Sequence, residues 1–520
     1  MKKNALFIIV TGLIISLSSV TKNVIAQANL DTLKSETSTL RDKVSGVEER
    51  IATAEGDLAK LTKIKLSGYI QAQWQQFENP SLYPNNYFSV RRARVKVTYE
   101  PLTGVAFVLQ PDFSPGALAL KDAYAQANDP WLKTFSIWAG QFNRPNYEVE
   151  YSSSSREVAE RSLVIRTLYP GERAIGAKLE IAPPNIPLKV QLALFNGNDA
   201  LTINDATNTN INPTNKDYDN GKDFMGRANY CFKLGSMGGL TIGANYYYGI
   251  MKASSSTTLA SDYTVKDGNV KVGSNLNRSW FGVEMQLYLD VLGGLAIKGE
   301  YLAGTNSYTG AYGTSSATGA TAYSLHNDTL TMSTTTTNTT TIRPNIIKNF
   351  QGYYVYLVKN IGKRNQLAIR YDYYDPNTKL KGTEIASLDS KGNPIYGYNG
   401  NASSTTTKIA YSGSSPVVAT KTINKTVISN ALYSDVSDLA TQTITLAYSY
   451  FFSDNIKFMI DYDFVLNEKV GMSTKTNPAD SGDPVGNIYK KYTVNNVDGW
   501  LDYSKVVPQN MLTLRLQVKF

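Results

Sequence analysis

Two stretches near the ends of the larger part of the chain decide its fold. Residues 64–74 read IKLSGYIQAQW, and residues 512–520 read LTLRLQVKF. Both alternate apolar with polar residues, so an extended strand places one kind of side chain on each face. Between them we count about fourteen further alternating segments, each about 10–14 residues long, which is the length of a tilted membrane-spanning strand. Clear examples are residues 240–248, 281–289, 295–303, 367–373, 444–452 and 456–464.

The connections between these segments alternate between short and long. The short ones are residues 101–102, 129–132, 182–186, 235–238, 292–293, 361–363 and 453–454. The others are much longer, except for residues 112–116: they are residues 143–172, 197–222, 252–277, 305–348, 375–439 and 467–509. Barrels of the Gram-negative outer membrane have short periplasmic turns and long extracellular loops. The sequence therefore predicts an all-β fold for residues 63–520, a transmembrane β-barrel of sixteen antiparallel strands, give or take two.

The composition of the loops and strand ends agrees with a barrel. The long connections contain stretches rich in Thr, Ser, Asn and Gly, such as residues 331–341 and 399–407, which we expect to be solvated and mobile. Tyr and Phe cluster at strand ends, as in residues 246–248 and 371–374, as expected for interfacial girdles. The terminal Phe520 resembles the C-terminal signature of outer-membrane barrels.

The first 26 residues have the features of a secretory signal peptide. The chain begins with Met1-Lys2-Lys3, residues 5–17 are apolar, and both 24–26 and 26–28 are small-residue cleavage candidates. The apolar run is too short to span a membrane, and no later stretch approaches about 18 consecutive apolar residues. Cleavage after Ala26 lowers the formal net charge from +9 to +6, because the segment carries three lysines and no acids.

Residues 29–62 follow a heptad pattern. Apolar positions recur at alternating spacings of three and four, with charged residues filling most of the other sites; they are Leu30, Leu33, Thr37, Leu40, Val44, Val47, Ile51, Ala54, Leu58 and Leu61. This narrow seam is typical of a left-handed coiled coil, which needs an identical neighbour to bury it. We therefore predict a short periplasmic coiled-coil helix in an oligomer; a lone amphipathic helix lying on a domain is the alternative.

The composition argues against enzyme chemistry. Charged residues make up 18% of the 520, below the roughly 25% of soluble chains. With one Cys and one His, the chain lacks the residues for an internal disulfide, a cysteine-built metal site or a histidine cluster. Carboxylate pairs such as Glu148/Glu150 are interpreted as loop or lumen charges. We expect no enzymatic activity, no cofactor, no metal and no nucleic-acid partner.

The chemistry of a barrel lies in its lumen. Alternation places Arg92, Arg94 and Lys96 of the second strand inside, whereas Arg91 points outward unless the strand bulges there. The same rule turns more cations than acids inward; the acids are Glu180, Glu284, Glu300, Asp372, Asp461 and Asp463. This excess favours a cationic lumen that attracts anions, over a mixed wall that merely stays hydrated.

The third loop, residues 143–172, differs from the Thr- and Ser-rich loops. It contains Arg144, Arg156, Arg161 and Arg166, together with Glu148, Glu150, Glu157 and Glu160. In sixteen-stranded porins the third loop folds inward and narrows the channel, so this loop is our candidate constriction. We expect a short helix over residues 155–163. The alternative is that its Arg and Glu residues pair with each other.

Several motifs together resemble one family. They read RRAR at 91–94, GQFNRP at 140–145, YSSSSR at 151–156, ERS at 160–162, PGERAIG at 170–176, FNGN at 195–198 and KDFMGR at 222–227. They resemble the phosphate-selective porins O and P, which implies a sixteen-stranded trimeric porin with an arginine-lined constriction. The resemblance assigns Arg91 and Arg92 as the arginine pair of the second strand, and Arg144 as the position before Pro145. The family's lysine cluster has no clear counterpart, and the acid-rich third loop argues against tight anion binding.

We therefore predict a homotrimeric porin, embedded in outer-membrane lipid, for passive diffusion of small hydrophilic solutes with a preference for anions such as phosphate. The residues expected at its constriction and anion-binding site are Arg91, Arg92, Arg94, Lys96, Arg144, Arg156, Arg161 and Arg166. Two alternatives remain open: a non-selective or sugar-preferring pore, and a surface adhesin that acts through its long extracellular loops.

Overall fold

The computed structural model contains two compact units, residues 1–65 and residues 66–520, which are described separately. The structure describes residues 35–53, 63–114, 118–145, 148–170, 172–197, 221–253, 255–267, 270–290, 293–308, 312–326, 329–342, 344–385, 397–398, 401–412, 418–429, 432–471 and 489–520. The predicted signal peptide lies outside these residues, and so do both ends of the heptad segment.

In the first unit, residues 35–53 form an α-helix. Its heptad positions Leu40, Val44, Val47 and Ile51 are each 50–60% exposed. Their spacing places them along one side of the helix, where they form a half-exposed apolar seam. Among the described residues no helix has both the length and the apolar character needed to cross a membrane.

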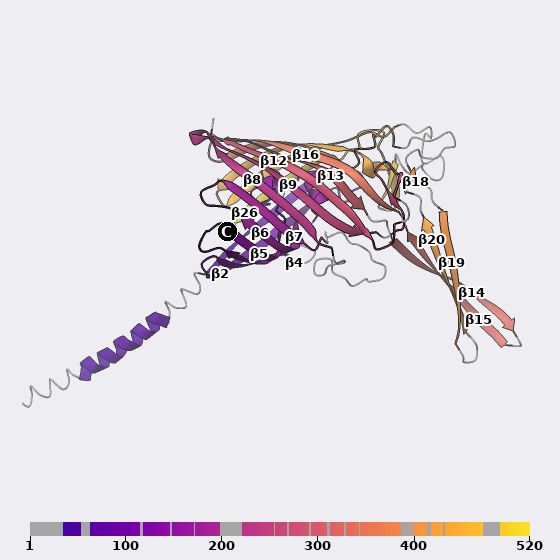
Figure 1. Ribbon diagram of the computed structural model, residues 1–520, viewed down its shortest axis with the longest axis horizontal. Helices are drawn as coiled ribbons and strands as arrows, with labels where there is room; N and C mark the ends of the chain where they lie inside the picture. The colour runs from indigo at the N-terminus through magenta and orange to yellow at the C-terminus, as the bar shows by residue number, and fades with distance from the viewer. Residues whose placement is uncertain are drawn as a thin grey trace, which may run out of the picture. The chain divides into compact units, whose positions relative to one another are not determined.

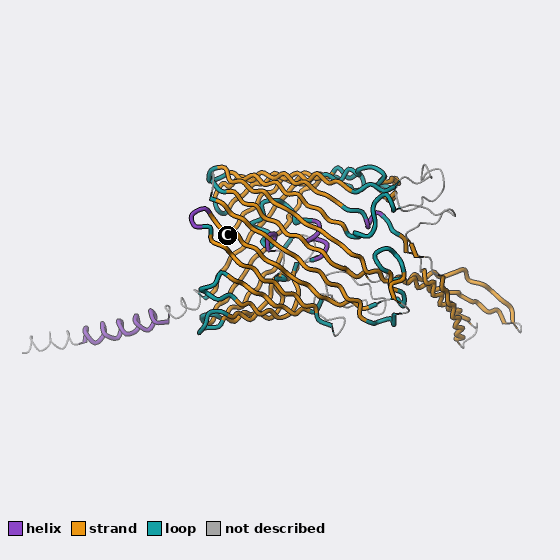
Figure 2. Tube along the Cα trace, turned by 45° about the horizontal axis from the view of Figure 1, so that its top comes forward, coloured by secondary structure: helices purple, strands orange, loops and turns teal. Residues whose placement is uncertain are grey.

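The second unit is a closed β-barrel (Figure 1; Figure 2). Within the described residues its main sheet has eighteen strands, of which β10 and β11 form a small hairpin and the other sixteen form the wall. The wall strands are β1 (Ile64–Phe77), β2 (Asn86–Leu102), β3 (Val105–Asp112), β4 (Ala119–Asn128), β5 (Phe135–Asn143), β6 (Arg173–Ile181), β7 (Leu188–Phe195), β8 (Asp223–Lys233), β9 (Gly238–Lys252), β12 (Asn275–Leu289), β13 (Leu295–Tyr308), β16 (Asn345–Ile361), β17 (Asn365–Asp375), β22 (Thr441–Ser453), β23 (Ile456–Asn467) and β26 (Met511–Lys519). The predicted fold and strand number are confirmed.

Pairing of the first wall strand with the last closes the barrel. β1 and β26 run antiparallel from the pair Tyr69–Lys519 to the pair Phe77–Met511. Beyond this ladder, Gly68 and Phe520 exchange two backbone hydrogen bonds, each 3.0 Å between nitrogen and oxygen. Closure leaves no open strand edge, which a sheet surrounded by lipid requires.

The wall is inverted relative to a soluble protein, with apolar side chains outside and polar ones inside. In β1, Ile70 is 50% exposed while its neighbour Gln71 is 2% exposed, and the same alternation continues around the barrel. The outer apolar side chains meet lipid, and the inner polar ones meet the lumen and the loop packed inside it.

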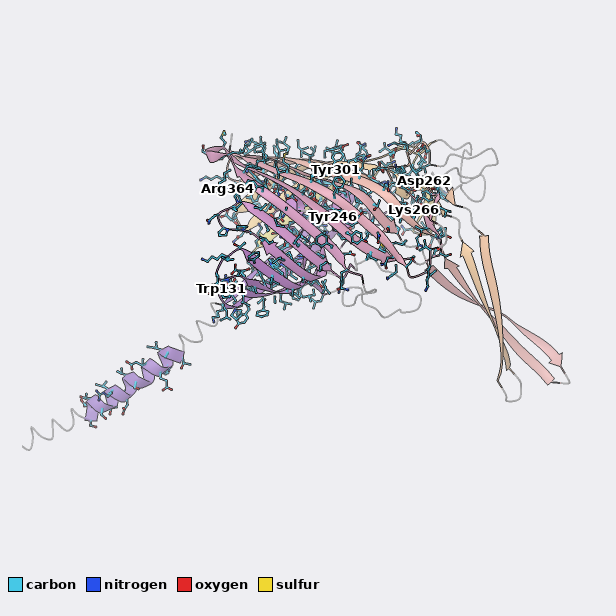
Figure 3. All side chains as sticks on the ribbon, in the orientation of Figure 1. Trp131, Tyr246, Asp262, Lys266, Tyr301 and Arg364 are labelled. Atoms are coloured by element: carbon cyan, nitrogen blue, oxygen red, sulfur yellow. The ribbon has the colours of Figure 1, made fainter. Side chains whose placement is uncertain are left out.

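The connections sort to the two ends of the barrel as the sequence predicts. Trp131 and Arg364, in or beside short turns, lie at one end, and Asp262 and Lys266, in a long connection, lie at the other (Figure 3). Tyr246 and Tyr301 lie on the wall between them. One predicted turn is displaced: residues 101–102 still belong to β2, and the chain reverses at residues 103–104.

The Thr-rich stretches of the long connections form strands, whereas the sequence analysis treats them as loops. β14 (Tyr312–His326), β15 (Thr329–Ile342), β20 (Val418–Ser429) and β19 (Asn401–Ser412) make a four-stranded sheet in that order. Thr is β-branched and favours extended backbone, so a polar Thr-rich stretch can pair where a partner strand is available.

Smaller elements complete the chain. They are the strands β10 (Thr258–Leu259), β11 (Val265–Asp267), β18 (Gly397–Tyr398), β21 (Leu432–Tyr433), β24 (Tyr489–Val494) and β25 (Val497–Asp502), the helix α2 (Leu163–Leu168), and the 3-10 turns η1 (Glu148–Glu150), η2 (Gly235–Met237) and η3 (Val436–Asp438). Of these, η1 and α2 belong to the third loop, between β5 and β6.

The substitution Gly68→Ala tests the closure of the barrel between β1 and β26. A Cβ atom there would lie 2.4 Å from the Arg94 carbonyl oxygen and from the Phe520 ring, so we expect Gly68→Ala to destabilise the barrel by roughly 1–3 kcal/mol. Gly239→Ala is the matched control, because the nearest atom to its Cβ is 3.6 Å away. Heat-modified gel mobility and urea unfolding of the two purified variants measure the difference; equal stabilities would contradict this account of closure.

Candidate functional site: the charged loop inside the barrel

Residues 144–172, here called the inner loop, fold into the barrel lumen. Gln71 of β1 donates to the Ser153 carbonyl oxygen at 3.1 Å, and Gln517 of β26 donates to that of Ser154 at 2.9 Å. On another part of the wall, the Leu163 N–H donates to the Asp372 carboxylate of β17 at 2.7 Å. These strand residues face the lumen, so the inner loop lies inside the ring of strands, where Figure 2 shows short helical segments.

The helix in the inner loop lies later than the sequence suggests. Residues 155–162 are irregular, and α2 begins at Leu163. The buried Glu150 carboxylate accepts hydrogen bonds from the Ser162 N–H and hydroxyl at 2.9–3.0 Å, and Asp372 accepts from Leu163. Two carboxylates distant in sequence, Glu150 and Asp372, thus accept hydrogen bonds from the amide groups at the start of the helix. The residues next to the helix do not reveal these partners.

The loop acids pair with cations on separate wall strands. Glu157 binds Lys298 of β13 at 2.7 Å, and Glu148 lies 3.4 Å from Arg227 of β8. The alternative considered from the sequence was that the Arg and Glu residues of the loop pair with each other. Arg161 and Glu172 form such a pair.

Glu150 anchors the loop to a third part of the wall. Its carboxylate accepts from the Tyr356 hydroxyl of β16 and lies 3.4 Å from Arg370 of β17. Arg370 also donates to the Glu160 carbonyl oxygen at 2.6 Å. Arg370 also lies within 4.0 Å of the Asp372 and Asp463 carboxylates, so breaking its contact with the fully buried Glu150 would leave the Glu150 carboxylate, rather than Arg370, without an opposite charge.

Glu160 connects the loop to wall strands on either side of the closure between β1 and β26. Arg91 of β2 donates two hydrogen bonds to it at 2.8 and 2.9 Å, and Arg515 of β26 donates one at 2.7 Å. Burial alone would raise the pKa of the Glu160 carboxyl, but the hydrogen bond and charge of Arg91, with the charges of Arg515 and Arg92, hold that pKa well below its usual value. Glu160 is therefore ionised.

The cations predicted on β2 have three different environments. Arg91 reaches the loop inside the barrel through Glu160, contrary to the outward direction that alternation predicts. Arg92 is 2% exposed and donates to the Gln71 side-chain oxygen at 2.8 Å, whereas Arg94 binds the Asp112 carboxylate at 2.7 Å. The pair with Asp112 cancels most of the field of Arg94, while Arg92 bonds a neutral acceptor.

The predicted arginines of the inner loop also differ. Arg144 is buried, with its guanidinium 6.0 Å from the centre of the Tyr169 ring, and Arg161 donates to the carbonyl oxygens of Glu150 and Tyr151 at 3.0 Å. Both support the fold of the loop. Arg166 is exposed on α2.

The remaining loop arginine, Arg156, lies beside cations that were not part of the predicted site. Its carbonyl oxygen accepts from Lys457 of β23 at 2.9 Å, and Arg515 lines the same small cavity. Alternation alone turns Lys457 and Arg515 inward. Lys457 and Arg515 come close to residue 156 because of the path of the inner loop. An irregular loop has no sequence periodicity from which that path could be predicted.

The ion pairs neutralise much of the charge around the inner loop. Each of the four loop acids predicted at the constriction contacts a wall cation, and Lys96 lies half-buried on the lumen face of β2. Within the described residues, Arg92 and Lys457 bond neutral oxygens. A modest positive excess therefore remains on the loop and on the wall beside it.

Comparisons with known proteins give one family match. Residues 64–268 match the family of phosphate-selective porins O and P. This range contains every motif on which the resemblance rests, so the resemblance is confirmed. A comparison with curated proteins gives no match.

Several solved structures are similar. They include the anion-selective porin from Comamonas acidovorans, with 10% identity, 88% of this chain and 99% of that chain covered, and a TM-score of 0.45. OprB of Pseudomonas putida has 9% identity, 90% and 96% coverage and a TM-score of 0.49. The trimer form of OmpT from Vibrio cholerae has 9% identity, 88% and 99% coverage and a TM-score of 0.43.

Glu160→Gln tests the loop anchoring. Loss of this carboxylate frees Arg91 and Arg515, so we expect a more mobile loop, noisier channel openings and a stronger preference for anions. Planar-bilayer recordings across a KCl gradient measure both effects. Asp454→Asn, in an exposed short turn, removes one acid away from the loop and should leave both unchanged. Identical recordings for Glu160→Gln and wild type would contradict the anchoring role.

Proposed function

From the match of residues 64–268 to the phosphate-selective porin O and P family, we propose a trimeric porin for passive diffusion of small hydrophilic solutes, with a weak to moderate preference for anions such as phosphate. The chain is an outer-membrane barrel, and its central feature is the charged inner loop bound inside the lumen. This loop narrows the passage, and the cations beside it set the selectivity.

The strength of the preference follows from the ion pairs. Arg guanidinium groups bind two oxygens of a phosphate at once, which suits an anion pathway. Here, however, Arg91 is bound to Glu160 and Arg94 to Asp112. Among the described residues no carboxylate binds Arg92 or Lys96, and their charges remain to attract anions, which supports passage with mild selectivity rather than tight binding.

Burial of the lumen aromatics argues against the sugar-preferring alternative. Trp280 and Tyr247 stack with ring centres 3.8 Å apart, and each is 2% exposed. The Trp280 indole donates to the Tyr169 hydroxyl of the inner loop at 2.6 Å. Tyr354 and Tyr356 are also buried. These rings pack the loop against the wall, so their faces are not available for stacking on sugars.

Arg92→Gln tests the anion preference. A unit charge acts on an ion 4–8 Å away through water with roughly 0.5–1 kcal/mol, so we expect the anion-to-cation permeability ratio to fall a few-fold. The zero-current potential across a KCl gradient measures this ratio. Arg364→Gln, which removes a cation at an exposed short turn, should leave it unchanged. A cation-selective wild type, or an Arg92→Gln variant with the wild-type potential, would overturn the assignment.

The heptad seam supports the trimer. Because its apolar side chains are half-exposed in one chain, we expect Leu40→Asn/Val47→Asn to lower the temperature at which oligomers dissociate, while the barrel still folds. Semi-native gels and analytical ultracentrifugation in detergent measure this. Asp42→Asn/Glu49→Gln, on the opposite side of the same helix, is the control. A wild-type protein that sediments as a monomer would refute the trimer.

A further inference from the structure

We propose that a halide ion such as chloride binds between the inner loop and the wall, held by the Arg156 guanidinium next to Lys457 and Arg515. The cavity is lined by Gln71, Ser153, Arg156, Lys457, Arg515 and Gln517, together with Val158 and Met459. These residues come from β1, the inner loop, β23 and β26. This halide site fixes the loop in place, a role separate from the passage of solutes.

Arg156 has the unused donors of the halide site. Its side chain is 3% exposed, yet no described residue accepts a hydrogen bond from its Nε, Nη1 or Nη2 atoms. A buried guanidinium without an acceptor is costly, and native structures rarely keep one. The amides lining the cavity are already engaged, because Gln71 donates to Ser153 and Gln517, and Gln517 donates to Ser154.

The surrounding charges favour an anion rather than a neutral acceptor. The positive charges of Arg92, Lys457 and Arg515 all act on the region of Arg156. Of the nearby acids, Glu160 is bound to Arg91 and Arg515, and Glu157 is bound to Lys298. A water molecule would accept hydrogen bonds from Arg156 but leave this positive excess uncompensated, whereas a halide satisfies both requirements.

The size of the cavity selects the kind of anion. Its volume is about 10 Å³, which is room for the centre of about one water-sized sphere. A chloride ion is slightly larger than a water molecule, so it fits with small side-chain shifts. A phosphate, with four oxygens around its phosphorus, would require the inner loop to move away from β23 and β26.

Asp461 offers a competing explanation. It faces the lumen on β23, where one carboxylate oxygen accepts from the Ala159 N–H at 2.9 Å and the other is buried without a partner among the described residues. If Asp461 were the partner of Arg156 in solution, the cluster would need no ion. The two explanations predict opposite responses to halide.

Thermal unfolding of the full-length protein in detergent, at constant ionic strength, distinguishes a bound halide from an ion pair between Arg156 and Asp461. Chloride replaces gluconate in steps, and we expect the unfolding temperature of the wild type to rise by a few degrees and then saturate. Arg156→Met should abolish the rise. Arg166→Met, which removes an exposed arginine of the same loop, should keep it, and so should Asp461→Asn. Phosphate at equal ionic strength should not replace chloride.

A crystal of the wild type grown in bromide provides a direct readout, because an anomalous peak beside Arg156 would locate the ion without any substitution. An unfolding temperature independent of halide, a rise that persists in Arg156→Met, or a rise lost in Asp461→Asn would overturn the proposal. Stabilisation by phosphate at lower concentration than chloride would also overturn it. None of these results depends on the ion selectivity of the open channel.

Discussion

Lipid offers no hydrogen-bonding partner to a backbone, so every amide and carbonyl group of a membrane-crossing segment must bond within the protein. The chain meets this constraint by pairing β1 with β26, which removes the last open edge of the sheet. The other features of the barrel depend on that closure. A closed wall has one outer face and one inner face, so the same alternation that places Ile70 in contact with lipid places Gln71 in the lumen.

Closure also explains why the inner loop carries so much charge. Polar side chains that point into a narrow lumen need partners, and the inner loop supplies them. Glu148, Glu157 and Glu160 bind cations on different strands, so the loop is held at several separate points around the wall. The loop resists displacement because several of these contacts must break before it can move. Each broken contact leaves a desolvated charge.

The alternation of apolar and polar residues, together with the lengths of the connections, was sufficient to predict the barrel from the sequence. Alternation predicted the strands, their number and their inward faces, and the lengths of the connections predicted which of them lie at the same end of the barrel. The prediction was weaker where structure depends on contacts distant in sequence. The helix of the inner loop begins at Leu163 because Glu150 and Asp372 satisfy amides there, and Arg91 faces Glu160 although alternation turns it outward. The Thr-rich stretches form strands because they pair with each other, which composition alone does not show.

The arginines that sequence analysis grouped into one site therefore differ in whether another group of the protein compensates their charge. Arg94 and Arg161 are committed to acceptors within the fold, so their charges add little to the field in the passage. Arg92 and Arg156 are equally buried, but no carboxylate among the described residues binds either of them. Desolvation of an uncompensated cation is unfavourable unless an anion comes close, and this cost is the source of its attraction for anions. The proposed preference for anions therefore depends less on the number of arginines than on which of them lack a carboxylate partner.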